Sequence, residues 1–245
     1  MKVVGIIAEY NPFHKGHQFH LSRARELTGA DYVIVVMSGN YVQRGTPAMF
    51  DKYTRAEAAL RSGADLVLEL PVSVATGSAE YFASGAVKML ADTGIVTDLC
   101  FGSECGSLMD LQKLADILAD EPEEYQILLR KYLKEGMSFP AARAHAVKDY
   151  APDLASDLLD TPNNLLGLEY LKALKRIHST ILPHTVQREG NAYHDNTVTD
   201  GKSASASGIR DTLMKSQGVF TDRILQQLPF PELYKDYEGL SPVSE

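Results

Sequence analysis

Two histidines near the start of the chain could do chemistry together. His14 and His17 lie three residues apart, with Lys15 and Gly16 between them, in a polar segment between an apolar run and a helix-like one. Ligands of open α/β sheets bind where strands end, and helix N-termini favour anions. The pattern suits a triphosphate whose α-phosphate is attacked while the imidazoles stabilise charge. The alternative, in which His17 caps a helix and His14 bonds within the loop, is not excluded by these four residues.

A second candidate lies late in the chain, where hydroxyl-bearing residues precede an arginine. Ser205 and Ser207 open a helix-like segment, and Arg210 falls near its first turn. Hydroxyls and backbone N–H groups at a helix start, followed by arginine, form an anion cradle. Runs of serine and alanine are also ordinary linkers, so this pattern indicates a site only in combination with the histidine loop.

The elements around these residues alternate between strand and helix. Continuous apolar runs predict strands, and apolar residues at helical spacing predict the helices between them. The expected strands are Val3–Ala8, Tyr32–Met37, Asp65–Leu70 and Asp98–Phe101, and the expected helices are His17–Leu27, Lys52–Arg61 and Ser84–Leu90. Such alternation implies βαβ crossovers, so the predicted fold class is α/β with a Rossmann-like parallel sheet.

The middle of the chain changes to helix-like segments separated by proline and glycine. They are Leu108–Ala119, Glu123–Lys134, Ala141–Lys148 and Leu165–Ile177. We interpret 106–178 as a helical insertion between an N-terminal part of the sheet domain, 1–105, and a C-terminal part, 179–227. The rest, 228–245, is rich in proline without periodicity, and we expect an irregular tail at which a longer protein could have been truncated.

Composition excludes several classes of protein. With 245 residues, of which 44% are hydrophobic, the chain can bury a sizeable core. The two cysteines, Cys100 and Cys105, are too few for a disulfide scaffold and fit a reducing, cytoplasmic location. No apolar stretch approaches the roughly eighteen residues of a membrane span. A net charge of −8 argues against a broad nucleic-acid-coating surface, although a local basic patch is compatible with it.

The motifs together resemble a known family. The histidine segment and the serine–arginine segment look like the two signatures of the HIGH-type nucleotidyltransferase superfamily. Further blocks resemble the bacterial tRNA(Met) cytidine acetate ligase family; they are Ala8–His14, Met37–Asn40 with Gln43–Gly45, Cys100–Glu104, Pro162–Gly167 and Tyr193–Asp195. These blocks stand in the expected order over most of the chain. The resemblance makes the sheet domain a nucleotidyltransferase domain.

The resemblance implies an ATP-dependent acetylation of tRNA. Acetate attacks the α-phosphate of ATP, and the acetyl group of the acetyl-adenylate passes to N4 of the wobble cytidine of elongator tRNA(Met). Magnesium is expected with the triphosphate, although no dedicated carboxylate cage stands out in the sequence. Family members usually continue into a C-terminal region that grips tRNA, whereas this chain ends at Glu245. The ATP site is therefore expected to be more complete than the tRNA site.

The resemblance also assigns site residues by position. His14, His17 and Arg210 are the catalytic candidates. The ATP-binding candidates are Ile7, Ala8, Glu9, Tyr10, Asn11, Pro12, Phe13, His14, Lys15, Gly16, His17, Gln18, Phe19, His20, Gly102, Asn163, Arg188, Ser205 and Ser207. Gly102 would let the base or ribose approach, Asn163 would supply an amide contact, and Arg188 a cation. Their alternatives are a turn glycine, a helix cap and a solvated charge.

Acetate and tRNA contacts are less sharply indicated. The loop after the second strand could bind acetate through Ser38, Gly39, Asn40 and Arg44, the last as a carboxylate fork, or it could be an ordinary flexible loop. Three basic residues on one helix, Lys52, Arg55 and Arg61, fit a solvated face better than a phosphate contact. The densest basic cluster is Lys172, Lys175 and Arg176, a candidate tRNA contact.

Two other functions compete with acetate ligation. One is another nucleotidyltransferase of the same superfamily, which would adenylate or cytidylate a small phosphorylated metabolite. The other is a non-catalytic module that binds ATP and RNA. The histidine loop handles only the nucleotide, so it does not separate these alternatives.

Overall fold

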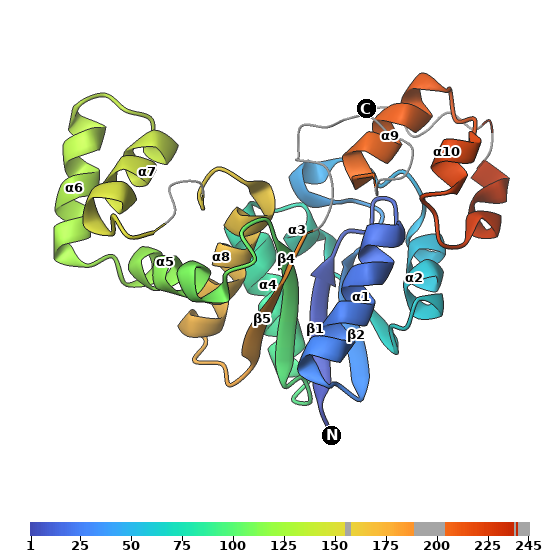
Figure 1. The fold of residues 1–245 in the computed structure, drawn as a ribbon, viewed down its shortest axis with the longest axis horizontal. Helices are drawn as coiled ribbons and strands as arrows, with labels where there is room; N and C mark the ends of the chain where they lie inside the picture. Colours follow the sequence, from blue (N-terminus) through green and yellow to red (C-terminus); the bar gives the residue numbers. More distant parts are fainter. Residues whose placement is uncertain (155–157, 189–203, 238, 240–245) are drawn as a thin grey trace.

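A single parallel sheet forms the centre of the molecule in the computed structural model, which describes residues 1–154, 158–188, 204–237 and 239 (Figure 1). Its five strands stand in the order β3-β2-β1-β4-β5. They are β1 (Val3–Ala8), β2 (Tyr32–Ser38), β3 (Leu66–Leu70), β4 (Asp98–Ser103) and β5 (Leu182–Gln187). The chain runs outward from β1 to β3 and then returns to the other side of β1. The predicted α/β class with a Rossmann-like parallel sheet is confirmed.

Helices cover both faces of the sheet because the side chains of each strand alternate between two apolar layers. Val4 and Ile6 face α1 (Lys15–Thr28) and α2 (Lys52–Arg61), whereas Val3 faces the opposite layer. That second layer contains α4 (Ala79–Asp92) and the short α3 (Val72–Ala75). Both β1 and β2 thus have apolar cover on both sides, which fixes the position of the loops at their carboxyl ends.

The helices between β4 and β5 divide into two groups. Two of them, α5 (Leu108–Asp120) and α8 (Pro162–Arg176), pack beside α4 through residues such as Leu111 and Leu168, in the same apolar cluster as Phe101. The other two are α6 (Glu123–Lys134) and α7 (Phe139–Tyr150), and they form a hairpin that projects to one side (Figure 1). Only part of the expected insertion therefore stands apart from the sheet layers.

The last described segment packs against the loop before α2. It contains α9 (Ala206–Lys215), α10 (Asp222–Leu225) and the 3-10 helix η2 (Pro231–Tyr237). Their apolar residues surround the ring of Phe50, and Leu228 and Tyr234 are buried there. The expectation of an irregular tail thus differs from the structure over 228–237. Apolar residues that each fill a separate place on a neighbouring surface show no helical period, and periodicity does not detect them.

Candidate active site

The histidine loop crosses the carboxyl end of β1 and opens α1, which begins at Lys15 rather than at the expected His17. His14 is the N-cap, and its Nδ1 accepts a hydrogen bond from Gly16 N at 3.0 Å. In return, His17 Nδ1 accepts from His14 N at 3.3 Å, and the two rings stand 3.9 Å apart. Backbone N–H groups only donate, so both Nδ1 atoms are unprotonated and each neutral ring presents an Nε2–H donor.

The capping contacts leave one of these donors without a partner. His14 is buried, and its Nε2 has no hydrogen-bond partner among the described residues. A buried donor that is left unpaired costs free energy, about 1–3 kcal/mol. A purely structural role in capping and loop bonding therefore accounts for Nδ1 of His14 only. Its Nε2 stays available to a ligand.

Burial and one cation keep the histidines neutral. Burial, and then the positive charge of Arg188, lower the pKa of His14 to about 3 and that of His20 to about 4. The pKa of His17 also lies well below its ordinary value, through burial and the neighbouring His14 and Arg188. Three neutral imidazoles near one guanidinium form a site that can donate to an anion without first being protonated.

Arg188 reaches this group from the end of β5. Its backbone N donates to Ser103 O at 2.9 Å, and a Cβ placed on Gly102 would lie 3.3 Å from Arg188 Cγ. The missing side chain of Gly102 thus gives room to the arginine stem. β1 and β4 are the strands between which the chain order reverses, where open α/β sheets bind ligands.

Arg210 joins the late motif to the histidine loop. Its Nη1 donates to Asn11 O at 2.6 Å, and Met49 N donates to Asn11 Oδ1 at 2.8 Å. Ser205 is the N-cap of α9, where its Oγ accepts from Gly208 N at 3.1 Å and lies 3.0 Å from Ser207 Oγ. The two motifs that the sequence separates by almost the whole chain therefore meet at one place.

Gln227, which sequence reasoning missed, ties the same elements together. Its carbonyl accepts from Lys15 N at 2.9 Å, and its Oε1 accepts from Ala204 N at 2.9 Å. It thus links the first residue of α1 to the residue before the Ser205 cap. Two adjacent glutamines, Gln226 and Gln227, in an otherwise apolar segment are the only signal that the sequence gives for it.

The candidate acetate loop lies beside the histidine loop and is held by Arg55. This arginine is fully buried and donates to Ser38 O at 3.1 Å, to Glu9 O at 2.6 Å, to Phe50 O at 3.0 Å and to Gly39 O. The solvated helix face expected for Arg55 is wrong, because the loop after β1 and the segment between β2 and α2 close over it. Glu9 in turn accepts at Oε1 from the backbone N of residue 43 at 2.8 Å.

The other residues of that loop and helix have different surroundings. Ser38 is buried, and its Oγ has no partner among the described residues. Asn40 Oδ1 accepts from Lys52 N at 3.0 Å, while the side chain of Arg44 lies outside the description. Lys52 pairs with Glu69 at 2.6 Å. Arg61 is an exposed residue that pairs with Glu57 and Glu232 at 2.5 and 2.9 Å.

Asn163 is engaged within the chain. Its Nδ2 donates to Glu104 Oε1 at 2.5 Å, and Asn164 N donates to Glu104 Oε2 at 2.9 Å. Asn164 Oδ1 accepts from Glu104 N at 3.0 Å and from Cys105 N at 3.2 Å. Glu104 thus satisfies N–H groups at the start of α8. The alternative in which Asn163 caps this helix is wrong, because Thr161 is the N-cap and Asn163 lies inside the first turn. An ATP contact by Asn163 stays a prediction.

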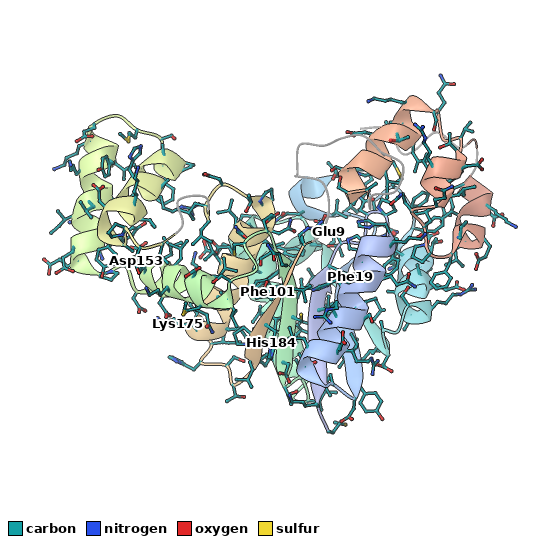
Figure 2. All side chains as sticks on the ribbon, in the orientation of Figure 1. Glu9, Phe19, Phe101, Asp153, Lys175 and His184 are labelled. Atoms are coloured by element: carbon teal, nitrogen blue, oxygen red, sulfur yellow. The ribbon has the colours of Figure 1, made fainter. Side chains whose placement is uncertain are left out.

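The remaining candidates differ in exposure. Ile7 and Ala8 end β1, and Glu9 lies at the carboxyl end of the sheet (Figure 2). The buried candidates of the loop are Tyr10, Pro12 and Phe13, whereas Gln18 is partly exposed and Lys15 and Phe19 are exposed on α1. Tyr10 has a φ of 51°, in the left-handed region, so the loop turns sharply at this residue. The block Tyr193–Asp195 falls outside the described residues.

The basic cluster expected to contact tRNA is neutralised within the chain. Lys175 binds Asp116 and Asp120, each at 2.7 Å. Lys172 pairs with Glu169 at 2.8 Å, and Arg176 pairs with Glu80. Across the part of the chain that the structure describes, no group of three or more metal-ligating side chains occurs, and no helix is long and apolar enough to span a membrane.

Lowering the pH should destabilise the fold between about pH 6.5 and about pH 4. In the unfolded chain histidine has a pKa near 6.5, whereas folded His14 and His20 have pKa values of about 3 and about 4. The unfolded state therefore binds more protons in this window, and stability present above it is lost as the pH falls.

Urea unfolding at about pH 7 and about pH 5 measures this loss. The His20→Gln variant should show a difference between the two pH values smaller by up to about 2 kcal/mol. The matched control is His178→Asn at an exposed position with a φ of 50°, and it should leave the difference unchanged. Equal pH differences in His20→Gln and wild type would contradict the neutral-histidine site.

The fold and the site define an α/β protein in which a histidine-capped helix, the candidate anion site, begins at the reversal point of the sheet. The family model described as "HIGH Nucleotidyl Transferase" matches residues 1–238. The chain belongs to this family.

Curated relatives and solved structures agree with the family. A tRNA(Met) cytidine acetate ligase of Acetivibrio thermocellus is 49% identical over 227 residues, which cover 92% of this chain and 54% of the relative. A tRNA(Met) cytidine acetate ligase of Clostridium novyi is 43% identical over 248 residues, which cover 100% of this chain and 62% of the relative. These relatives confirm the resemblance that the motif blocks predicted. The chain spans about half to three fifths of their length.

Two crystal structures of Thermotoga maritima TmcAL share the fold. The apo form superposes with a TM-score of 0.89 at 44% identity, covering 99% of this chain and 59% of the neighbour. The form bound with alpha-thio ATP has a TM-score of 0.83 at 43% identity, and the superposition covers 95% of this chain and 54% of the neighbour.

Proposed function

We propose that the chain activates acetate with ATP and transfers the acetyl group to N4 of the wobble cytidine of elongator tRNA(Met). The observation that carries the proposal is the buried Nε2–H of His14, which has no partner in the described part of the chain and stands at the N-terminus of α1 beside Arg188. A phosphate oxygen is the partner that such a donor fits. The names of the relatives and the nucleotide bound to the Thermotoga protein support ATP and acetate as substrates.

In the proposed reaction an acetate oxygen attacks the α-phosphorus of ATP, and the bond to the bridging oxygen of pyrophosphate breaks. Negative charge grows on the phosphoryl oxygens and on the leaving pyrophosphate. The Nε2–H groups of His14 and His17 donate to these oxygens, and Arg188 adds a fixed positive charge. Arg210 would add a second cation, after its Asn11 contact has placed it at the loop.

The second half-reaction transfers the acetyl group. The cytidine N4 attacks the acetyl carbonyl carbon, the bond to the adenylate oxygen breaks, AMP leaves with the electron pair, and one N4 proton passes to solvent. The loop Ser38–Asn40 would hold the acetyl end, where Ser38 Oγ, without a partner among the residues that the structure describes, offers a hydroxyl donor. Magnesium would come as the counterion of ATP, bound through phosphate oxygens, and supply positive charge there. A tRNA-modifying role places the protein in the cytoplasm.

Acetate-dependent exchange of labelled pyrophosphate into ATP, without tRNA, tests the first half-reaction. We expect exchange with acetate and little with phosphorylated alcohols. Exchange driven by a phosphorylated metabolite instead would favour the alternative nucleotidyltransferase. ATP binding without exchange under any acid would favour the non-catalytic binding module.

A further inference from the structure

Unpaired positive charge gathers on the hairpin of α6 and α7. The hairpin, 123–150, contains five lysine and arginine residues and four carboxylates in a chain whose net charge is −8. The basic residues are Arg130, Lys131, Lys134, Arg143 and Lys148. Of the carboxylates, Glu123 and Glu124 lie in the first turn of α6, Glu135 follows its last turn, and Asp149 accepts a hydrogen bond from the Tyr132 hydroxyl.

The hairpin differs in this respect from the helices next to it. On α5 and α8, Lys113, Lys172, Lys175 and Arg176 each form an ion pair with a carboxylate of the chain. In the described residues, by contrast, no ion pair involves the five basic residues of the hairpin; Arg130 donates only to the neutral Gln126, at 2.9 Å. The charge of the four exposed ones, Arg130, Lys131, Lys134 and Lys148, is therefore available to an anionic partner.

Three of these cations share one exposed face. Arg130, Lys131 and Lys134 line a shallow hollow on α6 together with Ile127 and Glu135. Their spacing of three and four residues places them along one side of the helix. Ile127 is 57% exposed, so the hollow also has an apolar floor that no described residue covers. We call these four residues, Ile127, Arg130, Lys131 and Lys134, the basic face of α6.

Aromatic side chains near these cations also suit an anionic partner. The Arg143 guanidinium lies 5.9 Å from the centre of the Phe139 ring, and Phe139 is 55% exposed. Lys131 Nζ lies 4.9 Å from the centre of the Tyr132 ring, which is half-buried and whose hydroxyl donates to Asp149, so only Phe139 offers an exposed ring. Cations beside exposed aromatic rings are typical of surfaces that contact RNA through phosphates and unstacked bases.

The position of the hairpin fits a large substrate. In Figure 1 the hairpin and the α9–α10 unit stand on opposite sides of the carboxyl ends of the strands, where the histidine site lies. A small substrate would not extend from that site to the hairpin, whereas a folded RNA would. Resting on the proposed function, we propose that the basic face of α6 binds the phosphate backbone of the tRNA whose wobble base enters the site.

Binding of an elongator tRNA(Met) transcript to the full chain, measured by fluorescence anisotropy over a range of salt concentrations, tests the proposal. The variant combines Arg130→Gln, Lys131→Gln and Lys134→Gln. We expect at least about tenfold weaker binding at low salt, and a slope of log affinity against log salt that is smaller by about 2–3, because three phosphate contacts are lost.

The matched control removes three exposed cations that already have partners: Arg23→Gln, Lys88→Gln and Lys113→Gln. It changes the net charge equally and should leave the slope unchanged. Both variants should keep acetate-dependent pyrophosphate exchange, which involves no RNA and tests the proposed function separately.

Three results would overturn the proposal. One is tRNA affinity and salt slope in the α6 variant that equal those of the control. Another is the absence of measurable tRNA binding by the wild-type chain at low salt. The third is unchanged RNA binding with altered self-association in sedimentation, which would make the basic face a contact between protein chains.

Discussion

Replacing His14 with asparagine should reduce acetate-dependent pyrophosphate exchange by about a hundredfold to a thousandfold while leaving the fold almost as stable. The asparagine carbonyl oxygen can take the place of Nδ1 and accept the hydrogen bond from Gly16 N, because asparagine is a favoured N-cap. It has no atom at the position of Nε2. The variant therefore removes only the donor that we assign to the phosphates, and losses of this size follow the removal of one such donor.

His14→Ala is the matched comparison for this prediction. It removes the cap and the donor together, so it should lose exchange to a similar degree and about 1 kcal/mol of stability in addition. Thermal unfolding measures the stability of both variants. If His14→Asn kept the wild-type exchange rate, Nε2 would not act on the phosphates, and His14 would be a helix cap alone.

Patterns formed by adjacent residues predicted most of the fold. Val3–Ala8 and Glu123–Lys134 have the predicted bounds, because a short apolar run and a regular amphipathic stretch are each defined by adjacent residues. The histidine loop was identified for the same reason: its residues are consecutive, and its place after a strand sets their direction. The short α3 was missed, because one turn gives too few residues for a period.

Contacts between distant segments could not be predicted. The residues that accept from Arg55 lie up to 46 positions away, and the carboxylate that binds Arg176 lies 96 positions away. In the sequence, Arg55 and Arg61 are both basic residues on one helix and cannot be told apart. In the structure, Arg55 is buried and Arg61 is exposed. Which one is covered depends on where the loops after β1 and β2 end, and that follows only from the assembled sheet.

Arg55 should accordingly be the costliest single position outside the histidine loop. We expect Arg55→Met to lower the free energy of unfolding by about 3–5 kcal/mol, because several buried carbonyl oxygens lose their donor at once. Methionine fills much of the volume and brings no charge, so the loss reports the hydrogen bonds rather than a cavity. Urea unfolding measures the change, and Arg61→Met, on the same helix with exposed ion pairs, should cost no more than about 1 kcal/mol.

The same substitution should also impair exchange at temperatures where the variant stays folded. Glu9 O, Ser38 O and Gly39 O all bind the Arg55 guanidinium, so its loss frees the loop after β1 together with the candidate acetate loop. Arg55→Lys retains the charge, but a single ammonium does not reproduce the guanidinium fork, so it should lie between Met and wild type in both measurements. Stability within about 1 kcal/mol of wild type for Arg55→Met would mean that the two loops keep their positions without it.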